Sequence, residues 1–215
     1  MAQVHLLSAI VAFCLLFAWG ESGSDPPFRG KLVYIHSLNL EFSNTAAVSD
    51  ELLSLEKADT LTYFVASDSV VYQEVKGRDG NARFVRKRSG AAHLIYDYRY
   101  NDVQSVGSFA HHKVKESFVY VGGSPSLLGL PCDEYLYSTN KDDNGRVVVA
   151  QFSYTLTMKD SMEKTALPVC QHGLKVDSEI RSKVTDELYW TNRRRLISYS
   201  YEKDIDVTEI ARLFE

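Results

Sequence analysis

The stretch Gly30–Phe42, GKLVYIHSLNLEF, decides the fold. Apolar residues and His36 occupy its even positions from 32 to 42, whereas polar residues take most of the odd ones. An alternation of period two over this length predicts a long strand with one face buried. Alternation of apolar and polar residues is typical of strands in an antiparallel sheet that has one covered face.

Similar strand signals continue to the C-terminus, separated by short polar turns such as Lys76–Gly80 and Asp142–Gly145. One early helix is expected at 49–57, where Ser49 is a good N-cap. The pattern predicts a mainly β protein: a single curled antiparallel sheet, a half-barrel of about eleven strands, with one or two short helices covering its concave side. The further strands are expected at 61–66, 70–75, 82–88, 92–100, 103–110, 116–121, 132–138, 147–158, 173–184 and 195–201, before a short C-terminal segment at 207–214.

The composition is that of an ordinary globular protein. The chain has 215 residues, 24 Lys and Arg against 28 Asp and Glu, and a formal net charge of −4. This balance provides no general field for nucleic acid phosphates, so we expect no nucleic acid partner. The length suits one large domain with a substantial core.

The N-terminal segment has the pattern of an export signal. Residues 1–20 carry no charged side chain, and an apolar run extends from Leu6 to Trp19, which is short for a membrane span and typical of a signal-peptide core. We expect cleavage after Gly20, with a site around Ser22 or Gly23 as the other option. An uncleaved signal anchor and acylation at Cys14 are further alternatives. The expected organisation is a signal peptide at 1–20, a lead-in at 21–28 and one domain at 29–215, in a secreted or extracytoplasmic protein.

Export leaves two cysteines in the mature chain, Cys132 and Cys170. An even pair in an oxidising compartment predicts a disulfide. The alternatives are two buried thiols or a catalytic Cys132. The spacing does not resemble a zinc site, and no metal or other cofactor is expected.

Aromatic side chains alternate along several predicted strands, which suggests a face that could hold an apolar ligand. Ordinary core packing gives the same pattern. His36 lies on the apolar face of its strand, either as a pH-responsive group or as a core histidine. The candidate ligand-lining residues are Tyr34, His36, Phe42, Tyr96, Tyr98, Tyr100, Phe152 and Tyr154.

Other patterns carry weaker hypotheses. His111 and His112 have no partner at metal-ligand spacing. The basic runs 83–88 and 193–195 are interpreted as solvated turn charges, or as a contact for anionic head groups or an acidic partner. No hydrolase, metalloprotease or nucleotide-binding motif is present. The sequence therefore predicts a protein without catalytic activity.

Three segments resemble the LolA-like family of exported half-barrels: FRGKLVYIHSLNLEF at 28–42, LTYFVASDSVVYQEV at 61–75 and the region around Gly129-Leu130-Pro131-Cys132-Asp133. The ending, LISYSYEKD followed by residues 210–214, also fits. The resemblance covers most of residues 28–215. It implies an open, strongly curved sheet that holds lipids or acyl chains on its concave face. The cysteine pair departs from the bacterial carriers of the family.

Two functions are therefore expected. The first is a non-enzymatic carrier or sensor that holds an apolar small molecule or lipid on the curled sheet. The second is an extracellular protein-interaction module with a filled core and no ligand. Membrane contact is expected to be peripheral at most.

Overall fold

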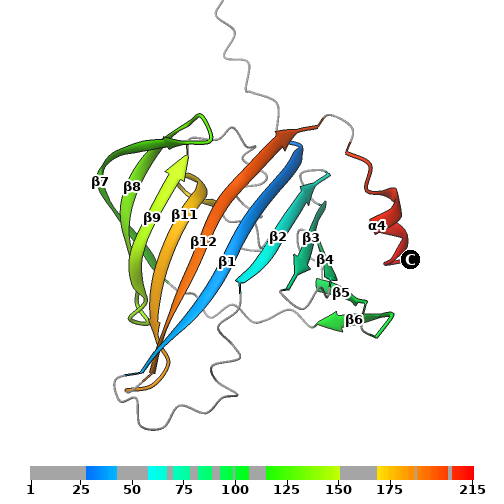
Figure 1. Cartoon of the computed structure of the whole chain (residues 1–215), viewed down its shortest axis with the longest axis horizontal. Coiled ribbons are helices and arrows are strands. Elements are labelled where there is room, and N and C mark those ends of the chain that lie inside the picture. The colour runs from blue at the N-terminus through cyan, green and yellow to red at the C-terminus, as the bar shows by residue number, and fades with distance from the viewer. Residues whose placement is uncertain are drawn as a thin grey trace, which may run out of the picture.

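The computed structural model of the chain is one curled antiparallel sheet with a short C-terminal helix (Figure 1). It describes residues 28–42, 58–66, 70–77, 82–88, 93–98, 100–106, 115–150, 169–186, 188–202 and 205–215. The expected signal peptide, the expected helix at 49–57, the histidines His111 and His112, and the ligand candidates Phe152 and Tyr154 lie outside these residues.

The sheet is built from two meanders that meet at its centre. Its order is β6-β5-β4-β3-β2-β1-β12-β11-β9-β8-β7, with β10 paired to β11. The strand bounds are β1 Gly30–Phe42, β2 Ala58–Val65, β3 Val70–Lys76, β4 Ala82–Arg88, β5 His93–Asp97, β6 Asp102–Val106, β7 Glu116–Leu127, β8 Leu130–Thr139, β9 Asn144–Ala150, β10 Val169–Cys170, β11 Gly173–Lys183 and β12 Leu188–Tyr201.

The central pair, β1 and β12, brings together the first and the last strand of the open sheet. Gly30 lies opposite Tyr201 and Phe42 lies opposite Leu188, with one register shift between Val33 and Tyr34. The sequence prediction for the curled sheet is confirmed, and β1 has the predicted bounds. β12 starts seven residues earlier than predicted, because residues 188–190 are all apolar and residues 191–194 are all polar, so this stretch does not alternate.

The C-terminal helix α4, Thr208–Arg212, packs on one face of the sheet near β3 and β4. Tyr72 and Phe84 are buried there against Phe214. Tyr72 lies opposite Phe64 in β2, so this face is the one that Tyr63 does not share. No described helix is long and apolar enough to cross a membrane.

The expected disulfide is not formed: Cys132 and Cys170 are both buried and are not joined to one another. Cys132 packs in a cluster with Val148 and Ala150, whereas Cys170 packs with Val147 and Val149. Because successive residues of β9 point to opposite faces, the two sulfur atoms lie on opposite sides of the sheet. A disulfide requires side chains that point toward each other, so the prediction from the cysteine count was wrong.

Candidate functional site

One face of β1, β2 and β12 carries the largest buried side chains of the sheet; we call it the core face. Tyr34 is 0% exposed and lies opposite Leu196 on β12 and Leu61 on β2. Its ring meets the ring of Tyr63 edge to face, with 5.7 Å between the centroids. Its hydroxyl donates a hydrogen bond to the carbonyl oxygen of Lys175, at 3.1 Å. This end of the core face is sealed.

Polar residues follow immediately along the same face. His36 comes two residues after Tyr34 and lies opposite Arg194 on β12 and Asp59 on β2. The side chain of Asn192, one step further along the core face of β12, hydrogen-bonds the His36 ring. A histidine, an arginine and an amide therefore adjoin the buried tyrosines. We call His36, Tyr63, Asn192 and Arg194 the polar cluster.

The electrostatics of these groups show that they lie close together. Burial lowers the pKa of His36, and the Arg194 charge lowers it further, while Asp59 and Asn192 oppose the shift. Burial also raises the pKa of Tyr63, and Arg194 counters this by favouring the ionised form. The same arginine acts on Tyr34, whose pKa burial raises well above its ordinary value. The guanidinium of Arg194 thus influences all three rings.

Beyond the polar cluster the core face becomes apolar again and opens. Leu38 and Leu40 are partly exposed, and Trp190, which lies opposite Leu40, is 41% exposed. β2 begins at Ala58, opposite Ser37, so the last residues of β1 pair only with β12 among the described strands. We call Leu38, Leu40 and Trp190 the open strip.

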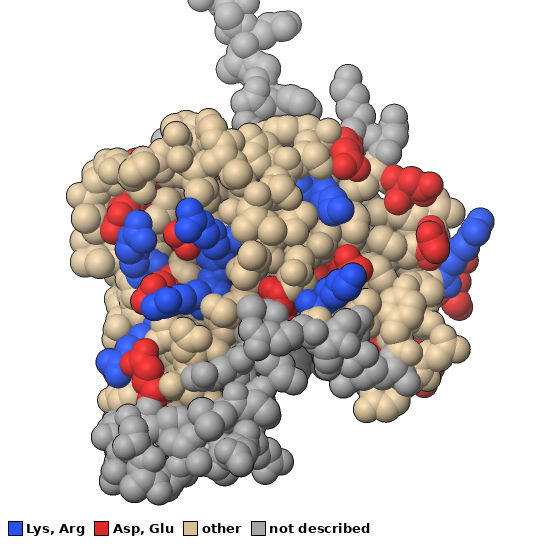
Figure 2. All heavy atoms as spheres, viewed as in Figure 1, with Lys and Arg blue, Asp and Glu red and all other residues tan. Residues whose placement is uncertain are grey.

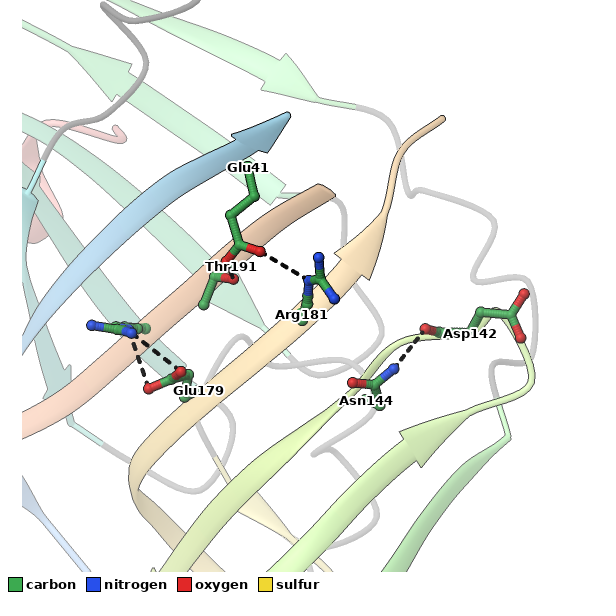
Figure 3. A network of polar contacts seen from close by, with 7 residues as sticks. Glu41, Asp142, Asn144, Glu179, Arg181 and Thr191 are labelled. Carbon is green, nitrogen blue, oxygen red and sulfur yellow. Dashed lines mark hydrogen bonds and ion pairs between the residues drawn. The ribbon is translucent and has the colours of Figure 1, made fainter. Parts of the chain in front are cut away.

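The opposite face of the sheet is charged here, and its acidic and basic side chains form ion pairs with one another. The Nε of Arg193 lies 3.1 Å from Glu179, and the Nε of Arg181 lies 3.0 Å from Glu41 (Figure 3). Glu41 also accepts a hydrogen bond from the hydroxyl of Thr191, at 2.7 Å. Figure 2 shows basic and acidic side chains intermingled over this region rather than a patch of one sign.

These contacts correct the interpretation of the basic run 193–195 as a turn. The run lies within β12, where alternation divides it between the two faces. Arg193 and Arg195 are exposed on the charged face, and Arg194 is on the core face. The run therefore forms no single surface for an acidic partner.

The predicted ligand-lining residues are only partly brought together. Tyr34 and His36 are adjacent on the core face; Phe42 is in the same strand, but the structure describes nothing of its side chain. The grouping of Tyr96, Tyr98 and Tyr100 on one strand was wrong.

β5 ends at Asp97, whose carbonyl accepts hydrogen bonds from the amides of Tyr100 and Asn101, both at 3.0 Å. Asn101 has a φ of 48°, which suits a tight turn. Tyr96 packs in the cluster below α4, and Tyr98 and Tyr100 are 50% and 64% exposed in the turn. These three tyrosines do not line the core face beside Tyr34.

Sequence reasoning missed Tyr63, Arg194 and Trp190. Tyr63 stands in a predicted strand, and its spacing from Leu61 and Val65 would have placed it on an inward face. Arg194 and Trp190 could not be placed, because the first half of β12 was not recognised as a strand. The pairing of β1 with β12, more than 140 residues away in sequence, brings them to the site.

No group of His, Cys, Asp and Glu suited to a metal ion occurs among the described residues. Neither a scan against protein-family models nor a search of curated proteins found a match for this chain.

Proposed function

We propose that this chain is an exported binding protein without catalytic activity, which holds an apolar ligand along the open strip of its core face. The observation that carries the proposal is the change in burial along one face of β1 and β12. Tyr34 and Leu196 are 0% and 1% exposed at one end, whereas Trp190 is 41% exposed at the other.

The length and chemistry of the open strip suit a long alkyl chain. A strand rises by about 3.3 Å per residue, so the four steps from His36 of the polar cluster to Leu40 of the open strip extend over about 13 Å. Covering apolar surface yields about 25 cal/mol per Å². An indole and two leucines offer broad apolar contact, and the polar cluster ends the strip on the side of the sealed core. The resemblance of residues 28–42 to the opening strand of LolA-like half-barrels supports a ligand of the same kind.

The absence of charge from residues 1–20 and the apolar run from Leu6 to Trp19 support export. Export suits a carrier or sensor that meets lipids outside the cytoplasm. The protein then acts by reversibly burying its ligand and not by catalysing a reaction.

Trp190 provides a direct test. The purified protein is titrated with hexadecanol while tryptophan emission is recorded. We expect a shift of the emission to shorter wavelength that saturates at one ligand per chain, because the ligand removes water from a partly exposed indole. Trp190→Phe, which removes the one tryptophan that remains after the expected cleavage behind Gly20, should abolish the shift. An emission spectrum that stays constant over the titration contradicts the proposal.

A second function, a protein-interaction module, is favoured by a different surface. Val119 and Leu136 form an exposed cross-strand pair on β7 and β8, at 58% and 56% exposed, and Val121 beside them is 56% exposed. β7 is an edge strand of the sheet, and exposed edges with apolar side chains favour pairing with another chain. Under this function hexadecanol leaves the Trp190 emission unchanged.

A further inference from the structure

Within the part of the chain that the structure describes, three polar atoms on the core face are buried without a hydrogen-bond partner: Nε2 of His36, the hydroxyl of Tyr63 and Nε of Arg194. Tyr63 is 1% exposed, so bulk water does not satisfy its hydroxyl. Buried polar groups in folded proteins are nearly always hydrogen-bonded, and an exception calls for a specific explanation. Three such exceptions on neighbouring strands call for a common explanation.

The three atoms belong to one place in the fold. His36 lies directly opposite Arg194 across the β1–β12 pair. Tyr63 contacts Tyr34 ring to ring, and Tyr34 precedes His36 on the core face. The Arg194 charge acts on both His36 and Tyr63. His36 and Arg194 are therefore direct cross-strand neighbours, and Tyr63, which lies opposite Leu32 on β1, is near enough for the Arg194 charge to act on it.

Arg194 and Tyr63 can donate hydrogen bonds, and the His36 ring can donate from Nε2 when that atom carries a proton. Arg194 carries only donors, and the Tyr63 hydroxyl is a donor toward any anion. The Asn192 side chain hydrogen-bonds the His36 ring, and Nε2 of this ring has no hydrogen-bond partner among the described residues. Asp59, the acidic residue opposite His36, acts on the imidazole through its charge and does not satisfy Nε2.

We propose that the polar cluster binds the anionic head group, carboxylate or phosphate, of a long-chain amphiphile. The proposal rests on the proposed function, because the alkyl chain of this ligand would occupy the open strip. The head group would accept hydrogen bonds from Arg194 and Tyr63, and from Nε2 of His36 when the ring is protonated there, and charge-assisted bonds of this kind are the stronger ones in proteins. This arrangement orients the ligand, with its anionic head group toward the sealed core and its alkyl chain toward Trp190.

The test compares ligands that differ only in the head group. Hexadecanoate, hexadecyl phosphate and hexadecanol are each titrated into the purified protein, with Trp190 emission as the readout. We expect one or both anionic ligands to bind about ten-fold or more tightly than the alcohol, as one charge-assisted contact implies. Whichever of the acid and the phosphate binds more tightly identifies the preferred head group.

The variant Tyr63→Phe removes one unpartnered hydroxyl and little else. We expect it to reduce the preference for the anionic ligand over hexadecanol by about ten-fold, and to leave the Tm of the ligand-free protein equal or higher. Tyr34→Phe is the matched control. Its hydroxyl bonds the Lys175 carbonyl, so this variant should lower the Tm and keep the wild-type preference.

Two results overturn the inference and leave the proposed function intact: equal affinities for the anionic ligands and hexadecanol in the wild type, or a Tyr63→Phe protein with reduced Tm and unchanged preference. The second result would show that the hydroxyl is a structural group. If none of the three ligands changes the emission, both the inference and the proposed function fail.

Discussion

Replacing Leu196 with alanine is expected to lower the free energy of unfolding by about 2–5 kcal/mol, the usual cost of truncating a buried leucine. Leu196 is 1% exposed and lies opposite Tyr34 at the centre of the sheet. The truncation leaves a cavity beside Tyr34 on the core face. Urea denaturation followed by circular dichroism measures the change.

The adjacent residue provides the control for this prediction. Ile197 is 43% exposed, so Ile197→Ala should change the free energy of unfolding by no more than about 0.5–1 kcal/mol. Equal losses in the two variants would contradict the placement of Leu196 at the sealed end of the core face.

Replacing Gly145 with alanine is expected to destabilise the protein by about 1–3 kcal/mol, because the new methyl group has no space. A Cβ at this position would collide with the backbone carbonyl of Glu179 and lie 2.8 Å from the Cα of Ile180. Gly145 is in β9 opposite Ile180 of β11, so the strain falls on the pairing of these two strands. Urea denaturation again measures the loss.

Gly122 in β7 is the matched control, since a Cβ there would meet nothing within 4 Å. Gly122→Ala should change stability by no more than about 0.5 kcal/mol. A Gly145→Ala protein as stable as this control would show that β9 and β11 are further apart than described.

Much of the fold could be predicted from local patterns, and the site only in part. The alternation in residues 30–42 predicted β1, and Asp142, which has a φ of 62°, lies in the predicted turn before β9. β12 was half missed, because Arg193 and Arg195 stand in a strand interior where ion pairing and exposure accommodate their charge. Local sequence does not show such partners.

The site depends on strand register, which the sequence does not reveal. Tyr34 and His36 were candidates because they share the even positions of one strand. Arg194 joins them only through the pairing of β1 with β12, and Tyr63 through the pairing of β1 with β2. The disulfide prediction failed for a related reason, since a cysteine count carries no information on which face of a sheet each thiol occupies.

The most direct measurement of the central claim locates the ligand on the protein. A hexadecanoate analogue with a photoreactive group at the end of its chain is cross-linked to the protein, and the labelled residues are identified by peptide mass spectrometry. The account predicts labels within residues 38–42 and 188–192, around Trp190. Labels confined to the exposed surface of β7 and β8, around Val119 and Leu136, or no labelling at all, would contradict it.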